Sequence, residues 1–221
     1  MVFWMVKALE FAYPGKGTVI KKISFNILAG ETVALLGPNG SGKTTLGKLL
    51  MGILKPGAGV VELEGKAIGS YSLGEIGSRV GYVFQNPDKQ IFTSSVRAEV
   101  AFGLRYRGYS EREIAVRVDE LLNYFELKKR ADAFPFNLSR GEKQRLAIAS
   151  IMALEPGFII FDEPTTGLDF RRKEKFAELL TRVKDRGAGY ILISHDHQFS
   201  KSNCERTLAM KEGKLICSSF N

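Results

Sequence analysis

Cysteine and long apolar runs are both scarce in this chain of 221 residues. The first argues against a disulfide-stabilised protein, and the second against a protein with membrane-spanning helices. Its two cysteines, Cys204 and Cys217, are too few for a disulfide framework and lack metal-site spacing, so we expect free thiols in a reducing cytoplasm. No apolar run approaches the roughly 18 residues of a membrane-spanning helix. The longest, from Met1 to Val6, has no basic leader or cleavage site, which favours a first strand over a signal peptide.

Charge of both signs is present, with an excess of positive charge that is not clustered. The 32 Lys and Arg against 24 Asp and Glu give a formal net charge of +8. Such an excess suits binding to nucleic acid or to an anionic membrane surface. However, bases and acids alternate, as in Glu111-Arg112-Glu113, which is typical of a solvated helix face. We therefore expect no nucleic-acid partner.

One segment carries the complete phosphate-binding pattern G-x-x-x-x-G-K-[ST], between a predicted buried strand, Thr32–Leu36, and a predicted helix from Thr44 to Leu50. Glycines let several backbone N–H groups converge on a phosphate, and the helix directs its positive end at the same point. Lys43 supplies charge to the β- and γ-phosphates, and Thr44 supplies an oxygen to Mg²⁺. A glycine-rich turn with an incidental lysine would not need this flanking strand and helix. The residues expected to hold the nucleotide are Gly37, Pro38, Asn39, Gly40, Ser41, Gly42, Lys43, Thr44 and Thr45.

Predicted strands at both ends of the chain flank a helical middle. Glu64-Gly65 and Glu212-Gly213 are predicted hairpin turns. The capping-box patterns Ser110-x-x-Glu113 and Ser139-x-x-Glu142 open predicted helices. The predicted strands are Ile23–Leu28, Thr32–Leu36, Val60–Leu63, Lys66–Ile68, Arg79–Phe84, Phe158–Phe161, Tyr190–Ile193, Thr207–Met210 and Leu215–Cys217. This order predicts an α/β nucleotide-binding core, residues 1–85 and 155–221, interrupted by a helical subdomain, residues 86–154, all within a single domain.

Two carboxylates end the apolar strand Phe158–Phe161. Asp162 is placed to hold Mg²⁺ directly or through water, as strand-end aspartates do in P-loop proteins. Glu163 points elsewhere because strand side chains alternate, and it is a candidate to orient or deprotonate the attacking water. The alternative, a strand ending at a polar turn before Pro164, is weaker with a phosphate loop upstream.

The segment Leu138-Ser139-Arg140-Gly141-Glu142 resembles the signature motif of the ATP-binding cassette family, usually Leu-Ser-Gly-Gly-Gln. Further motifs of that family occur in the expected order along essentially the whole chain. They are Tyr13, similar to the aromatic residue that stacks on adenine, Gln85 of the glutamine loop, Asp169 of the aspartate loop in Gly167-Leu168-Asp169, and the switch histidine His195. The resemblance implies a P-loop NTPase fold with a RecA-like core, an N-terminal antiparallel β subdomain and an inserted helical subdomain.

Several of these residues also have a purely structural interpretation. Ser139 and Glu142 can be a helix cap, which is compatible with an anion docking at the same helix terminus. Tyr13 can be a packing aromatic, and His195 a hydrogen-bonded strand-end residue, whereas His197 has no motif to support a role. Arg140 and Glu142 depart from the family pattern. An added acid is unfavourable near phosphate unless it turns into the cap, and the sequence does not decide this.

The resemblance implies ATP and Mg²⁺ as cofactors and an ATP hydrolysis reaction. Lys43, Gln85, Glu163 and His195 would be catalytic, and Thr44, Gln85 and Asp162 would serve the metal. Ser139 and Gly141 of one chain, with Asp169, would complete the nucleotide site of a second cassette. ATP would thus close a homo- or heterodimer, and hydrolysis would reopen it.

The segments Gln85–Phe92 and Val96–Leu104 resemble the ATPases of energy-coupling factor importers, which take up vitamins or transition-metal ions. That resemblance implies a transmembrane coupling subunit, a separate substrate-binding membrane subunit and a peripheral location on the cytoplasmic side of the membrane. It also implies that a C-terminal extension common in such ATPases is missing here. The alternatives are a conventional transporter ATPase with another membrane partner and a soluble cassette ATPase acting on nucleic acid or ribosomes.

Overall fold

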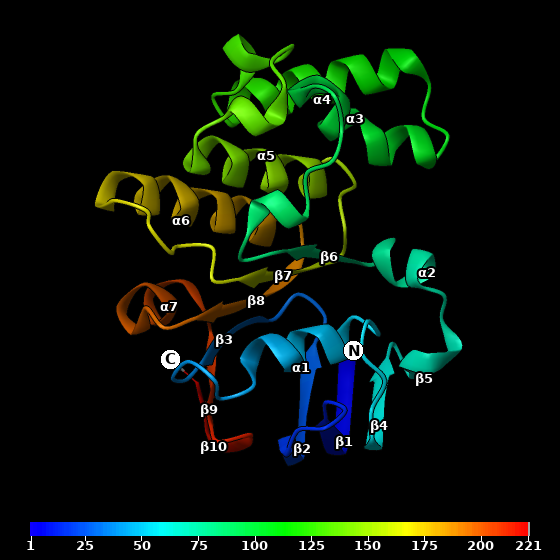
Figure 1. Cartoon of the computed structure of the whole chain (residues 1–221), viewed down its shortest axis with the longest axis vertical. Helices are drawn as coiled ribbons and strands as arrows, with labels where there is room; N and C mark the ends of the chain where they lie inside the picture. The colour runs from blue at the N-terminus through cyan, green and yellow to red at the C-terminus, as the bar shows by residue number, and fades with distance from the viewer. Residues whose placement is uncertain (221) are drawn as a thin grey trace. The chain divides into compact units, whose positions relative to one another are not determined.

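The computed structural model describes residues 1–220, with the side chains of residues 217, 218 and 220 left out, so the expected thiol of Cys217 lies outside the described part (Figure 1). The chain groups into two compact units. The first comprises Met1–Tyr82 and Gly157–Asn221, and the second comprises Val83–Pro156. The functional division expected at residues 86 and 154 stays a prediction.

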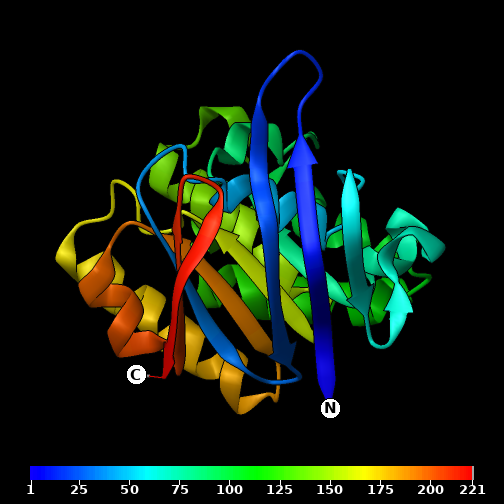
Figure 2. The same cartoon turned by 90° about the horizontal axis from the view of Figure 1, so that it is seen from below.

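An antiparallel sheet of four strands belongs to the first unit, in the order β2-β1-β4-β5. Its strands are β1 (Val2–Ala12), β2 (Thr18–Leu28), β4 (Ala58–Leu63) and β5 (Lys66–Ala67). The long blue hairpin in Figure 2 is formed by β1 and β2. Glu64 and Gly65 both have positive φ, of 51° and 79°, as the predicted tight turn between β4 and β5 requires.

The second sheet has six strands, in the order β10-β9-β3-β8-β7-β6. Its strands are β3 (Thr32–Leu36), β6 (Val80–Val83), β7 (Phe158–Asp162), β8 (Gly189–Ser194), β9 (Arg206–Lys211) and β10 (Lys214–Phe220). β3 pairs in parallel with β8 and β9, and β7 pairs in parallel with β8. Every residue of β3, β7 and β8 is buried, as parallel strands covered on both faces should be.

Helix α1 (Lys43–Leu50) contacts both sheets of the first unit, since it touches β2, β4 and β7. Beside it, the Trp4 indole donates a hydrogen bond to the carbonyl of Leu50 at 3.2 Å. The Trp4 ring packs edge-on against Phe3 and Phe158 at 4.7 Å, which ties the antiparallel sheet to β7. The other helices of this unit are α2 (Leu73–Gly77), α6 (Phe170–Asp185) and α7 (His197–Asn203).

Three helices form the body of the second unit: α3 (Val96–Tyr106), α4 (Glu111–Tyr124) and α5 (Arg140–Met152). α3 packs on both others through fully buried apolar residues such as Leu104, Leu122 and Leu146. The predicted capping boxes at Ser110 and Ser139 are present, so side chains satisfy the first amides of α4 and α5. A third box, Ser72 with Glu75, opens α2 and was not predicted.

The mixed α/β class expected from the sequence is confirmed, with small differences at strand ends. Ile68, predicted to end a strand, instead begins a 3₁₀ turn, Ile68–Ser70, after the two-residue strand β5. Cys204 is a buried thiol, and burial raises its pKa to about 12. Across residues 1–220, every helix is too short or too polar to cross a bilayer.

Candidate functional site

The phosphate-binding pattern forms a loop of left-handed glycines between β3 and α1. Gly37, Gly40 and Gly42 have φ of 156°, 79° and 103°. A Cβ on Gly37 would overlap the carbonyl oxygen of Met210 and lie 2.8 Å from Ser41 Oγ, so no larger residue fits. No side chain caps α1, and its first turn holds no acidic residue. Its first amides are therefore open to an anion.

One buried atom in this loop lacks a partner. Ser41 Oγ has no hydrogen bond within the described residues. Buried hydroxyl groups are normally satisfied, so this orphan fits a loop built to receive a ligand oxygen. The ammonium of Lys43 lies in the same loop, only 6% exposed, and donates to the carbonyls of Gly37 at 2.8 Å and Pro38 at 3.1 Å. The loop thus combines positive charge with N–H donors, which suits a polyphosphate.

The first strand-end carboxylate, Asp162, lies against the beginning of α1. Thr44 Oγ1 donates to Asp162 Oδ1 at 3.1 Å. From β6, the hydroxyl of Tyr82 donates to Asp162 Oδ2 at 2.9 Å. Burial raises the pKa of Asp162, and the two hydrogen bonds act in the opposite sense because they stabilise the carboxylate. Asp162 is therefore a buried carboxylate held by two donors, one of them from the phosphate loop.

The residues around Asp162 fit a Mg²⁺ ion that is shared with phosphates. Thr44 and Asp162 offer hard oxygen ligands. Among residues 1–220, no group of three or more His, Cys, Asp and Glu side chains could enclose a metal ion by itself. Mg²⁺ commonly takes one or two protein ligands and completes its shell with phosphate oxygens and water. The donor set suits that arrangement.

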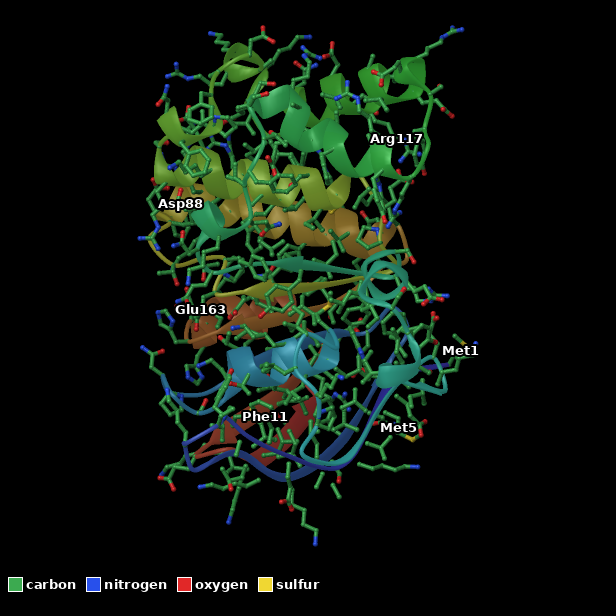
Figure 3. The ribbon with its side chains drawn as sticks, turned by 45° about the vertical axis from the view of Figure 1, so that its right-hand side comes forward. Met1, Met5, Phe11, Asp88, Arg117 and Glu163 are labelled. Carbon is green, nitrogen blue, oxygen red and sulfur yellow. The ribbon has the colours of Figure 1, made fainter. Side chains whose placement is uncertain are left out.

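The second carboxylate, Glu163 (Figure 3), faces a different set of residues. Its Oε2 lies 2.8 Å from His195 Nδ1 and 3.4 Å from Thr166 Oγ1, and its Oε1 lies 4.0 Å from Lys43 Nζ. The Glu163 side chain is 7% exposed, whereas that of His195 is 60% exposed. Glu163 has a φ of 52°, uncommon for this residue type, where the chain leaves β7. Asp162 and Glu163 thus point to different neighbours, although Glu163 lies beyond the end of β7 and its backbone is not extended, so strand alternation is not the cause.

The expected adenine and aspartate-loop residues also belong to the first unit. Tyr13 is half-buried, and its hydroxyl lies 3.3 Å from Oγ1 of Thr45, which is in the first turn of α1. Asp169 is exposed and caps α6 by accepting from the amide of Arg172 at 2.9 Å. On the same helix, Lys173 forms an ion pair of 2.6 Å with Asp196, the neighbour of His195.

Gln85, Ser139 and Gly141 belong to the second unit, whereas the phosphate loop belongs to the first, so their part in one site stays a prediction. Gln85 is exposed, three residues after Tyr82. Ser139 is the N-cap of α5, and Gly141 lies in its first turn. Glu142 turns into the cap: its Oε2 accepts from the amide of Ser139 at 2.8 Å. This bond is the main cause that lowers the pKa of Glu142.

Sequence reasoning missed Tyr82. The residue was part of a predicted strand, and its phenol finds a partner 80 positions away in the chain. Only the pairing of β6 beside β7 brings the two side chains together. No local pattern carries such information, because strand order is a long-range property.

The phosphate-binding loop, the helix α1 with its uncapped N-terminus, and the acids Asp162 and Glu163 at the end of β7 define a P-loop nucleoside triphosphatase core. Comparison with known proteins narrows the class, because a family profile described as ABC transporter matches residues 20–166. The chain belongs to the ABC transporter family and carries its ATPase domain.

Two solved structures and one curated protein illustrate the similarity. CbiO1 from Clostridium perfringens, described as part of the ABC transporter complex cbiONQ, is 35% identical with a TM-score of 0.84, covering 99% of this chain and 88% of that one. The ATP-binding cassette MJ0796, a dimer in a post-hydrolysis state bound to ADP and Pi, is 28% identical with a TM-score of 0.89, covering 98% of both chains. The energy-coupling factor transporter ATP-binding protein EcfA1 of Mycoplasma pneumoniae is 38% identical over 198 residues, 90% of this chain and 72% of that protein.

Other curated relatives are much longer. The chain spans only 34%, 38% and 33% of the length of the first three that it matches.

Proposed function

We propose that this protein hydrolyses ATP and uses the reaction to drive a membrane importer of the energy-coupling factor type. The observation that carries the proposal is the placement of Glu163, whose two oxygens face His195 and Lys43 beside the phosphate loop. A buried carboxylate between a lysine and an orienting histidine suits the activation of a water molecule. The same loop supplies the phosphate-binding groups.

In the proposed reaction the chain positions its substrate and neutralises charge. The amides that open α1 and the ammonium of Lys43 hold the β- and γ-phosphates. Thr44 and Asp162, with Gln85, hold Mg²⁺, which neutralises charge on the phosphate oxygens. Glu163 accepts a proton from the attacking water as its oxygen bonds to the γ-phosphorus and the bond to ADP breaks. His195 holds the Glu163 carboxylate in position.

A second cassette completes the site in this proposal. Ser139 and Gly141, at the start of α5, would contact the γ-phosphate held by a partner copy, with Asp169 at the same interface. Tyr13 would stack on the adenine. The dimeric state described for MJ0796 supports the dimer. ATP then favours the closed pair because only that state lets both chains contact the γ-phosphate.

Exposed aromatic residues in the second unit support the membrane partner. Phe92 and Phe102 are 62% and 48% exposed and pack edge-on, with ring centres 4.7 Å apart. The buried carboxylate of Glu99 accepts from the amides of Phe92 and Thr93 at 3.1 and 2.9 Å, which fixes the loop that carries Phe92. An apolar pair held in place in this way suits docking of a transmembrane coupling subunit.

The similarity to EcfA1 and to a CbiO1 of the cbiONQ complex supports the energy-coupling factor class. A separate membrane subunit would then bind the transported vitamin or metal ion, and this chain would lie peripherally on the cytoplasmic side of the membrane. The positive net charge of +8 is compatible with an anionic membrane surface.

The replacement Glu163→Gln tests the reaction. It keeps the shape of the side chain and removes the proton acceptor, so we expect the loss of phosphate release and an ATP-bound dimer on a sizing column. The matched control is Glu178→Gln, on the exposed face of α6, which should behave like the parent. Parental turnover in Glu163→Gln would contradict the assignment.

The replacement Phe92→Asp tests the partner. Membranes that contain the whole transporter should yield the parent chain together with two kinds of membrane subunit, identified by mass spectrometry. The variant should lose these subunits while its own ATP affinity stays parental. Co-purification of a different transmembrane protein would favour a conventional transporter instead.

A further inference from the structure

The hydrogen bond between Tyr82 and Asp162 is a buried polar contact of the site that the proposed reaction does not use. Tyr82 is part of β6 and is only 6% exposed. Its hydroxyl donates to Asp162 Oδ2, while Thr44 donates to Oδ1. Each oxygen of the carboxylate therefore has a donor, one from β6 and one from α1. Together the two donors restrict rotation of the carboxylate.

Helix α1 makes room for the Tyr82 ring by carrying a glycine at position 47. A Cβ on Gly47 would lie 3.1 Å from the Tyr82 hydroxyl and 3.2 Å from its Cε2. Glycine in the interior of a helix is unfavourable by about 1 kcal/mol relative to alanine. The close approach of the tyrosine accounts for glycine at this position, because a side chain here would crowd the phenol beside Asp162.

We infer that Tyr82 is a positioning residue for the metal-binding carboxylate. The inference rests on the proposed function, and it assigns to Tyr82 the task of holding the Asp162 carboxylate in the orientation that receives Mg²⁺ with the nucleotide. Groups that hold a metal ligand by hydrogen bonding commonly change metal affinity about 10- to 100-fold when removed. Without the phenol, Oδ2 is a buried oxygen with no donor, and the carboxylate can rotate away.

The replacement Tyr82→Phe removes the hydroxyl and keeps the ring. The probe is ADP with a fluorescent N-methylanthraniloyl group, titrated once with excess Mg²⁺ and once with EDTA. ADP avoids both turnover and ATP-driven dimerisation. We expect the gain in affinity caused by Mg²⁺ to fall about tenfold or more in the variant. The affinity in EDTA should stay parental, because the inference assigns the Tyr82 hydroxyl to the metal-binding carboxylate and not to the phosphates.

The matched control is Tyr190→Phe. Tyr190 is equally buried, lies in β8 of the same sheet, and donates its hydroxyl to the carbonyl of Asn203, away from the site. This variant loses a buried phenol hydroxyl and should keep the full Mg²⁺ gain. A parental Mg²⁺ gain in Tyr82→Phe overturns the inference, as does an equal loss of affinity in Mg²⁺ and EDTA, which would mean a general structural role.

A second variant, Gly47→Ala, decides the matter if Tyr82→Phe does not fold. Its added methyl group would lie 3.1 Å from both the Tyr82 hydroxyl and Cδ1 of Ile193, so it crowds the phenol beside Asp162 without removing a hydroxyl group. We expect the Mg²⁺ gain to fall with the EDTA affinity unchanged. A parental gain in that variant overturns the inference. The parent protein is measured first: if it binds the probe under neither condition, the proposed function fails and Tyr82 has no role to play. Binding by the parent with no change in either variant refutes the role of Tyr82 alone.

Discussion

The contact between His195 and Glu163 gives a quantitative prediction for His195→Ala. The two side chains meet at 2.8 Å, and in the assigned role the Glu163 carboxylate accepts this bond from a His195 tautomer that carries its proton on Nδ1. Hydrogen bonds to charged groups contribute about 1.5–3 kcal/mol. The His195 side chain is 60% exposed, so water competes for this bond and we take its contribution from the lower end of that range. A rise of about 1.5 kcal/mol in the reaction barrier corresponds to a roughly tenfold fall in kcat.

The assay is steady-state phosphate release from Mg²⁺-ATP. In His195→Ala the KM for ATP should change little, because the loop and Lys43 hold the nucleotide. The control is His197→Ala, an exposed histidine two residues further on, which should match the parent. Parental kcat in His195→Ala would refute the assigned role.

A double-mutant cycle with Glu163→Gln sharpens this prediction. If His195 acts by holding the Glu163 carboxylate, its removal should matter little once that carboxylate is gone. The coupling free energy should therefore be about as large as the effect of His195→Ala alone. Single-turnover measurements with radiolabelled ATP can follow the slow variants. An equal rate loss in both backgrounds would show that the histidine acts independently of Glu163.

Two further predictions concern the loop and the pH response. Gly37→Ala must displace the loop, because its Cβ would overlap the carbonyl of Met210, so we expect lost ATP affinity by calorimetry. Gly40→Ala should lose less affinity, because its Cβ meets nothing within 4 Å and only the strain of a φ of 79° remains. The hydrogen bond from Lys173 lowers the pKa of Asp196 below its ordinary value. The resulting stability is present above that ordinary value and is lost as pH falls through the lowered pKa. Lys173→Met should therefore unfold at lower urea near neutral pH, by about 0.5–1 kcal/mol, with the difference vanishing in acid; a pH-independent difference would contradict this.

Local patterns predicted the parts of the site that are contiguous in sequence. The glycine spacing from Gly37 to Gly42 predicts a loop whose positive φ values favour glycine, so its conformation follows from the local sequence. The hairpin turn at Glu212-Gly213, with φ of 49° and 82°, and the capping box at Ser110 are local in the same sense. Each depends on residues no more than five positions apart.

The remaining structure depends on long-range pairing that no such pattern encodes. β3 lies between β8 and β9, which follow it by more than 150 residues. This arrangement, and the neighbouring places of β6 and β7, decide that Tyr82 meets Asp162 and that His195 meets Glu163. The family resemblance assigned His195 and Glu163 to one site without predicting their contact, and the contact between Tyr82 and Asp162 was not anticipated at all.

The three capping boxes share one arrangement. In those at Ser72 and Ser110 the hydroxyl donates to its glutamate, at 2.8 and 2.6 Å. At Ser139 the backbone amide donates to Glu142 at 2.8 Å, a side-chain bond from the same serine also helps to lower the pKa of Glu142, and the carboxylate turns toward Arg130 at 3.4 Å. The negative charge of Glu142 is thus held by the cap and by a neighbouring cation. The acid that replaces the family's usual glutamine therefore repels a phosphate at the start of α5 less than an unpaired carboxylate would.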